Sequence, residues 1–171
     1  MTEEENTPTE TTSAKEQTKS GQFGLQRIYV KDLSFEAPNG ILAAKPGFQP
    51  KLSQDLGTNV NKVGEDLYEV VLSLTVTVKT EDDSTAFLVE VHQAGLFAVK
   101  GLEGGPLQHI LSSQCPQMLF PYVRELVDSL VVRGGFPPLM LPPINFDALF
   151  AQAVAQAKQK AQAEAEAATQ Q

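Results

Sequence analysis

The chain has 171 residues, a formal net charge of −8 and a pI near 4.7. This acidic balance argues against nucleic acid and anionic membrane surfaces as partners, because phosphates select Lys and Arg, and it favours a basic partner. A single cysteine excludes an internal disulfide framework, and no apolar run approaches the roughly eighteen residues that span a bilayer, so we expect a cytoplasmic protein.

The two ends of the chain differ from its middle in composition. Residues 1–22 are rich in Thr, Glu, Ser and Lys, contain no secretory signal and are expected to form a disordered polar tail. Residues 156–171 are rich in Ala and Gln, with good helix propensity and almost nothing to bury, and are expected to be flexible. The sequence therefore predicts one folded domain over residues 23–155.

The stretch QRIYVKDLSFE at 26–36 indicates a first strand with imperfect alternation. One parity holds Tyr29, Leu33 and Phe35, and the other holds Ile28 and Val30. We expect the first three side chains to face the core. Ile28 and Val30 then lie on the opposite face, where they favour a surface covered on association.

Three further strands are expected after this one. A Pro/Gly-punctuated loop leads to a weaker strand around 51–56. Residues 67–79 alternate almost strictly, and residues 85–93 resume the alternation after the polar turn EDDS. The last two runs therefore predict an antiparallel hairpin.

Apolar spacing then becomes helical between 119 and 131. Pro116 and Pro121 are placed near the start of this helix, and Gly134-Gly135 at its end. A short helical turn is expected around 106–112, and Asn145 is expected to cap a last helix. Strands followed by helices indicate an α+β fold with about four strands and two principal helices.

Few residues are typical of a catalytic or metal site. His92 and His109 fall in no known motif, and with one cysteine they lack zinc-like spacing. Cys115 at a helix start is interpreted as a small core residue rather than as a nucleophile. GLEGG at 101–105 lacks the features of a phosphate loop and is interpreted as a turn. We therefore expect no enzyme activity, cofactor or metal.

Four long motifs carry a resemblance to a known family. They are QRIYVKDLSFEAPN, DLYEVVLSLTVTV, TAFLVEVHQAGLF and CPQMLFPYVRELVDSLVVRGGFPPLMLPPINFDALF. In this order and register, from 26 to 150, the chain resembles the proteobacterial protein-export chaperone SecB. The resemblance implies a four-stranded antiparallel sheet with two helices, assembled as a dimer of dimers. Such proteins bind unfolded precursor proteins without ATP and deliver them to the translocation ATPase SecA.

The resemblance also implies two sites. The first is a docking site for SecA, the translocation motor, on an acidic patch formed by Asp32, Glu36, Leu88 and Glu90. The alternation along each strand agrees with placing these four residues on one sheet face. A client-binding groove includes Phe48, Leu52 and Leu56, with Gln54 at a position that is often aliphatic in the family. The Ala-rich C-terminal tail does not match the family's second motor contact, so no residue there is assigned to it.

Two other functions remain open on the residues alone. One is a chaperone dedicated to a single client, such as an antitoxin. The other is a small-molecule enzyme on a dimeric α+β scaffold, with His92 or Glu90 catalytic, which the lack of a base-and-orienter motif disfavours.

Overall fold

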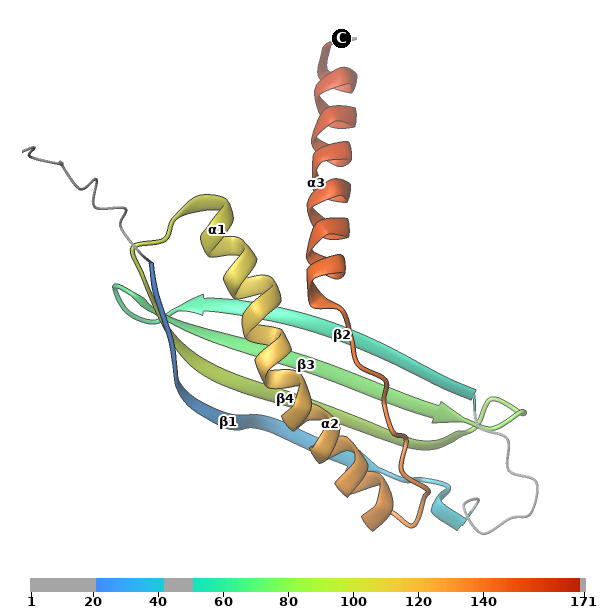
Figure 1. Cartoon of the computed structure of the whole chain (residues 1–171). Coiled ribbons are helices and arrows are strands. Elements are labelled where there is room, and N and C mark those ends of the chain that lie inside the picture. The colour runs from blue at the N-terminus through green and yellow to red at the C-terminus, as the bar shows by residue number, and fades with distance from the viewer. Residues whose placement is uncertain (1–20, 42–50, 170–171) are drawn as a thin grey trace, which may run out of the picture.

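The structure is a computed structural model that describes residues 21–41 and 51–169. Four strands form one sheet: β1 (Gln22–Glu36), β2 (Lys51–Lys62), β3 (Leu67–Lys79) and β4 (Thr85–Lys100). Their order is β1-β4-β3-β2 and every neighbouring pair is antiparallel (Figure 1). This confirms the predicted α+β class and the predicted hairpin of β3 and β4.

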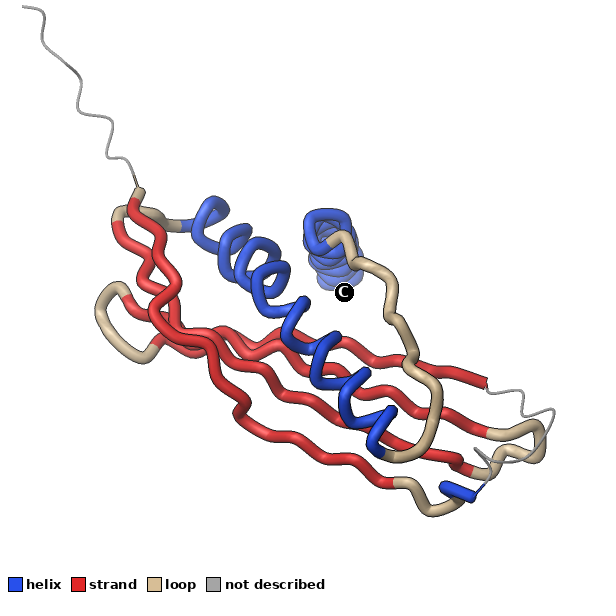
Figure 2. The backbone as a smooth tube through the Cα atoms, turned by 60° about the horizontal axis from the view of Figure 1, so that its bottom comes forward, coloured by secondary structure: helices blue, strands red, loops and turns tan. Residues whose placement is uncertain are grey.

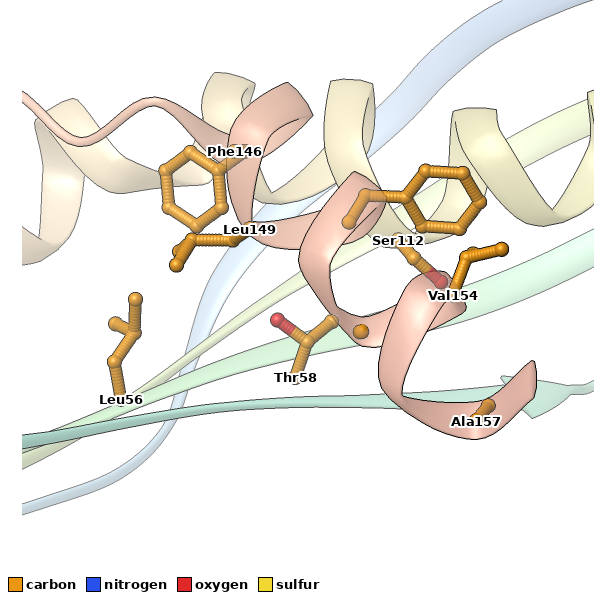
Figure 3. Close-up of a pocket in the computed structure, with 9 residues that line it drawn as sticks. Leu56, Thr58, Ser112, Phe146, Leu149, Val154 and Ala157 are labelled. Carbon is orange, nitrogen blue, oxygen red and sulfur yellow. The ribbon is translucent and has the colours of Figure 1, made fainter. Parts of the chain in front are cut away.

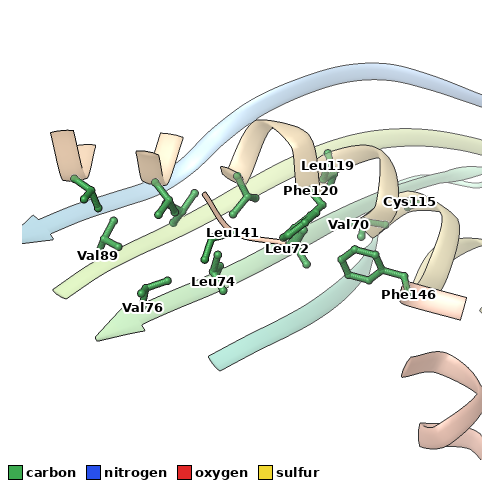
Figure 4. Packing of buried hydrophobic residues seen from close by; sticks show 14 of the residues in the cluster. Val70, Leu72, Leu74, Val76, Val89, Cys115, Leu119, Phe120, Leu141 and Phe146 are labelled. Carbon is green, nitrogen blue, oxygen red and sulfur yellow. The ribbon is translucent and has the colours of Figure 1, made fainter. Parts of the chain in front are cut away.

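One face of the sheet carries the core, as the alternation predicts. Its fully buried side chains on β3 and β4 include Val70, Leu72, Leu74, Val76, Val78, Val89 and Val91. These side chains pack against those of a long helix, among them Cys115, Leu119 and Phe120 (Figure 4). Each such side chain contributes roughly 1.5–3 kcal/mol by leaving water, so this face fixes the register of the central strands.

A single long helix covers that face, and it consists of three segments. They are α1 (Gly104–His109), the π-helical turn η2 (Ile110–Gln114) and α2 (Cys115–Arg133), which follow one another without a break. Figures 1 and 2 show it crossing the sheet on one side. The helical turn expected around 106–112 is therefore the first part of this helix.

Pro121 lies inside α2, and its placement near the helix start is wrong. A proline in a helix interior leaves the carbonyl four residues earlier without its usual donor. Here Pro121 and Gln117 are both exposed, so water can satisfy that carbonyl. The core side of α2 is unaffected, because Leu119 and Val123 remain fully buried.

Helix α3 (Phe146–Thr169) begins where the sequence predicts. The Ala148 amide donates to Asn145 Oδ1 at 2.9 Å, which confirms Asn145 as the N-terminal cap. Phe146 is buried, whereas every described side chain after Val154 is exposed, and the helix extends away from the sheet (Figure 1). The flexibility expected from residue 156 remains a prediction.

Two bulges in β1 reverse part of the predicted facing. The register with β4 shifts between Leu25 and Arg27 and again between Val30 and Asp32. Each shift adds one unpaired residue, after which the alternation continues on the other face. Ile28 therefore pairs with Gly95 on the helix-covered face and packs against the core, so its assignment to an association surface is wrong.

The predicted facing of two more β1 residues is also wrong. Val30 pairs with Gln93 and lies on the helix-covered face, not on the opposite face as predicted. Phe35, which pairs with Val89, lies on the same face. Tyr29 pairs with Ala94 and faces the opposite way, so it does not serve the core as predicted. We call the sheet face turned away from the helices the outer face.

Candidate functional site

The outer face brings together the four residues that the resemblance assigns to motor docking. Asp32 pairs with His92, and Glu36 pairs with Leu88. Glu90 pairs with Ser34 between them. Because cross-strand partners project to the same side, the acidic patch of Asp32, Glu36, Leu88 and Glu90 is continuous across β1 and β4. The predicted parity of these four positions is confirmed.

His92 lies inside the same patch. Its Nε2 is 2.8 Å from Glu90 Oε1, and its Nδ1 is 3.4 Å from Ser73 Oγ on β3. No sequence motif contains His92, although its place two residues after Glu90 on one strand puts both side chains on one face. The pair holds the carboxylate of Glu90 in a defined position on the surface.

A second cluster on the outer face was missed from the sequence. Glu69 on β3 accepts hydrogen bonds from Tyr29 Oη and from Lys31 Nζ, the latter at 2.7 Å. It also accepts one from Asn61 Nδ2 at 3.0 Å. We call these four residues the Glu69 cluster. Its members come from β1, β3 and β2, so no spacing within one strand reveals it.

The Glu69 cluster fixes its own ionisation. The hydrogen bonds from Lys31, then Tyr29, then Asn61 lower the pKa of Glu69 to about 2. The same contact with the carboxylate raises the pKa of Tyr29 above its usual value. At neutral pH the cluster therefore holds a carboxylate paired with an ammonium ion and a neutral phenol.

An apolar pocket of about 460 Å³ lies on the other side of the sheet, between β2 and α3 (Figure 3). Its lining comes from β2, η2 and α3, and comprises Leu56, Thr58, Ser112, Phe146, Leu149, Phe150, Ala153, Val154 and Ala157. Of the residues expected in a client groove, Leu56 lines this pocket. Leu52 is half-exposed on the same face of β2, and Phe48 lies outside the described residues.

The wall formed by α3 is anchored by its first turn. Asp147 Oδ1 accepts a hydrogen bond from the buried Ser113 at 2.5 Å and lies 2.9 Å from His109 Nε2. These contacts, with that from Ser113 the larger, lower the pKa of Asp147. The rings of His109 and Phe150 meet edge to face at 5.3 Å. The pocket is thus bounded by a helix that is tied to the end of α1 through His109 and to η2 through Ser113.

Cys115 lies in the core, and its interpretation as a small buried residue is confirmed. Burial raises the pKa of its thiol to about 12, which keeps it protonated at neutral pH. Within residues 21–41 and 51–169, no three His, Cys, Asp or Glu side chains are grouped so that they could hold a metal ion. No helix in these ranges is long and apolar enough to cross a membrane.

Comparison with known proteins places these features in a family. Residues 15–157 match the family model described as preprotein translocase subunit SecB. The chain is 58% identical to the protein-export protein SecB of Saccharophagus degradans over 158 residues, which is 92% of this chain and 94% of that protein. It is 50% identical to the same protein of Stutzerimonas stutzeri, covering 91% of this chain and 94% of that protein.

A solved structure agrees on the fold. A SecB-like chaperone of Mycobacterium tuberculosis, solved in complex with a peptide from an antitoxin, matches with a TM-score of 0.61 at 20% identity. The match covers 71% of this chain and 90% of that chain. From these matches, the chain belongs to the SecB family of protein-export chaperones.

Proposed function

We propose that the chain acts in the cytoplasm without ATP, holding unfolded precursor proteins in an export-competent form and delivering them to SecA. The observation that carries this proposal is the apolar pocket beside β2. Its lining includes no acid, base or thiol, which supports binding rather than catalysis. β2 is also an edge strand, paired only with β3 among the described strands, and β-addition of an extended client is available there.

An extended client would use the pocket and the strand edge together. Alternate side chains of the client enter the apolar lining around Leu56, and its backbone pairs with the free edge of β2. Leu52 lies four residues along the same face and extends the apolar surface. Recognition of this kind reads no sequence code, so a folded protein would be excluded because its apolar side chains and backbone are already buried.

The acidic patch supplies a separate surface for SecA. It lies on the outer face, whereas the pocket lies on the helix-covered side, so a client and the motor need not compete for space. Complementary charge would mainly raise the association rate and make binding sensitive to salt. Leu88 adds an apolar side chain among the carboxylates.

A homotetramer, assembled as a dimer of dimers, is proposed from the surface of α2. Met118, Tyr122 and Val132 are between 39% and 53% exposed. Their spacing puts them on one side of the helix, turned away from Leu119 and the sheet. A second copy of the chain packed on this stripe would bury them.

A chaperone dedicated to one client is the second candidate. The Mycobacterium tuberculosis neighbour, whose structure holds an antitoxin peptide, is the observation in its favour. That protein is 20% identical to this chain, whereas the SecB relatives named for protein export are 50–58% identical. The export function is therefore the better supported of the two.

The test is the refolding of an unrelated, slow-folding precursor with and without the chain, in the absence of ATP. We expect stoichiometric arrest of refolding, because each bound client is sequestered rather than turned over. Arrest of many unrelated precursors supports a general holdase. Normal refolding at excess chain would contradict the proposal, and arrest of one client alone would favour the dedicated chaperone.

A further inference from the structure

The Glu69 cluster lies on the same face as the acidic patch, and the two meet at one peptide bond. Lys31 belongs to the cluster and Asp32 to the patch. The bulge between Val30 and Asp32 leaves Lys31 without a partner on β4. Its side chain reaches Glu69, so Lys31 and Asp32 are consecutive residues that both face outward, with Cα atoms about 3.8 Å apart.

Lys31 is an unfavourable neighbour for an acidic docking surface. An exposed ammonium beside Asp32 would pair with that carboxylate and compete with any cationic partner. In the structure the Lys31 ammonium is instead bonded at 2.7 Å to Glu69. Glu69 stands on β3, opposite Leu96 of β4, so Lys31 reaches across β4 and away from the patch.

The surroundings of Glu69 favour its contact with the Lys31 ammonium. The Glu69 side chain is 12% exposed and also holds Tyr29 and Asn61, so it is fixed from three directions. On β4, Ala94 pairs with Tyr29 on one side and with Val71 on the other, and this small residue is fully buried although no described helix covers this face. A fixed, partly buried carboxylate binds an ammonium better than a mobile surface carboxylate does.

We propose that Glu69 is a positioning residue for docking: by holding the Lys31 ammonium across β4, it leaves the charge of Asp32 free for a cationic surface of the motor. This inference rests on the proposed docking role of the acidic patch. Glu69 itself does not touch the partner. Loss of Glu69 releases Lys31, whose nearest carboxylate along the chain is then Asp32.

The direct charge of Glu69 is too distant to have the same effect. Asp32 pairs with His92, four positions from Leu96, the partner of Glu69 on β4, and two strand spacings separate β1 from β3, which places Asp32 roughly 16 Å from Glu69. That distance exceeds the Debye length of about 10 Å at 0.1 M salt. Asp55 is closer to the patch. It pairs with Thr75, which in turn pairs with Glu90, so two strand spacings of roughly 9.6 Å in total separate Asp55 from Glu90.

This geometry supplies a matched control. Glu69→Gln and Asp55→Asn each remove one outer-face carboxylate, but Glu69→Gln alone releases a lysine. Binding of purified SecA is measured for both variants, for Lys31→Gln and for Lys31→Gln/Glu69→Gln. Titrations at about 0.1 M and about 0.5 M salt separate charge effects from the rest, since the higher salt screens exposed charges.

We expect Glu69→Gln to raise the Kd for SecA roughly threefold to fivefold at the lower salt, the size of one exposed charge pair. The loss should vanish at the higher salt. Lys31→Gln should bind at least as tightly as the natural chain, and the double variant should return to within about twofold of it. Asp55→Asn should stay within about twofold, which bounds the plain charge effect.

Three results with Glu69→Gln, its control and the double variant would overturn the inference. They are unchanged docking by Glu69→Gln, an equal loss in Asp55→Asn, and a double variant that remains as weak as Glu69→Gln. The last would show that the cluster acts by holding strands together. Should Glu69→Gln fail to fold, Lys31→Gln still decides, because weaker docking in that variant contradicts the proposed role.

Failure of the docking proposal itself gives a different pattern. If Asp32→Ala/Glu36→Ala/Glu90→Ala binds SecA as the natural chain does, the acidic patch is not the docking surface. If that triple variant loses binding while Glu69→Gln does not, the patch stands and the positioning role of Glu69 is wrong.

Discussion

Ser113 in η2 donates its hydroxyl proton to Asp147 in the first turn of α3, with 2.5 Å between the oxygens. Ser113 is fully buried whereas the Asp147 side chain is exposed, so the bond ties a surface carboxylate to a buried hydroxyl, and without it His109 is the remaining side-chain contact of Asp147 Oδ1. The contact ties the end of the pocket wall to the long helix. We expect Ser113→Ala to loosen α3 without unfolding the sheet.

Hydrogen exchange of the amides in residues 146–154 measures this directly, and we expect about tenfold faster exchange in Ser113→Ala. The lowered pKa of Asp147 gives the pH dependence. Stability from an acid with a lowered pKa is complete above its usual value, near 3.8, and is lost as pH falls through the lowered one. Unchanged exchange at neutral pH would show that the aromatic contacts alone hold α3.

Gly95 allows α2 to lie close to β4. A Cβ atom at this position would stand 2.5 Å from Phe97 Cε2 and 2.9 Å from Leu119 Cδ2, both on buried side chains. We expect Gly95→Ala to lower the free energy of unfolding by about 1–3 kcal/mol through overpacking. Urea denaturation at one fixed protein concentration measures the change, because assembly adds to apparent stability.

Gly57 on β2 is the matched control. A Cβ atom there meets nothing within 4 Å. Gly57→Ala should therefore change stability by no more than about 1 kcal/mol, in either direction. Equal losses in the two variants would mean that the steric argument at Gly95 is wrong.

The strands could be predicted from the sequence because their residue types record which face is buried. In β3 the alternation of Leu72, Leu74 and Val76 with Ser73 and Thr75 is enough to place that strand. In β1 the same method failed at Ile28, because a bulge moves a strand to its other face without a distinctive residue type. The inward and outward positions of β1 therefore required the register with β4.

The candidate sites also divide into those that one strand's sequence predicts and those that depend on how the strands and helices pack. Asp32 and Glu90 could be placed on one face because the pairing of β1 with β4 is regular from Asp32 onward. The Glu69 cluster could not, since Lys31 and Glu69 are 38 residues apart and their strands are not neighbours. The pocket at Leu56 depends in the same way on where α3 packs.

Assembly through α2 can be tested by placing charge on its exposed stripe. A carboxylate at an apolar interface must be desolvated without a partner, which strongly disfavours association. We expect Tyr122→Asp/Val132→Asp to shift native mass spectra from four chains towards smaller species. Val63→Asp, at a residue that is 53% exposed between β2 and β3, should leave four chains. A stable monomer of the natural chain would contradict the assembly proposal.

Client binding at the pocket can be tested at Leu56. Leu56→Asp places a charge in the apolar lining, so we expect severalfold more chain to be needed for arrest of precursor refolding. Ser53→Asp adds the same charge to β2 on the outer face, where Ser53 pairs with Thr77, and should arrest refolding as the natural chain does. Equal arrest by both variants would place the client elsewhere.

Docking of SecA on the acidic patch can be tested by removing its three carboxylates together. Each exposed charge contributes modestly, but three adjacent ones act on the same partner surface. We expect Asp32→Ala/Glu36→Ala/Glu90→Ala to weaken SecA binding roughly tenfold or more near 0.1 M salt, and less at higher salt. Binding titrations at several salt concentrations provide the measurement.

The control for this variant removes the same number of charges elsewhere. Glu65, Glu81 and Glu103 are exposed residues outside the strands, and replacing them with Ala gives the same net charge as the patch variant. SecA binding should then stay near that of the natural chain, and both triple variants should still arrest precursor refolding. If the patch variant loses arrest and docking together, the two activities share a surface or the variant is misfolded, and the separate outer-face docking site is wrong.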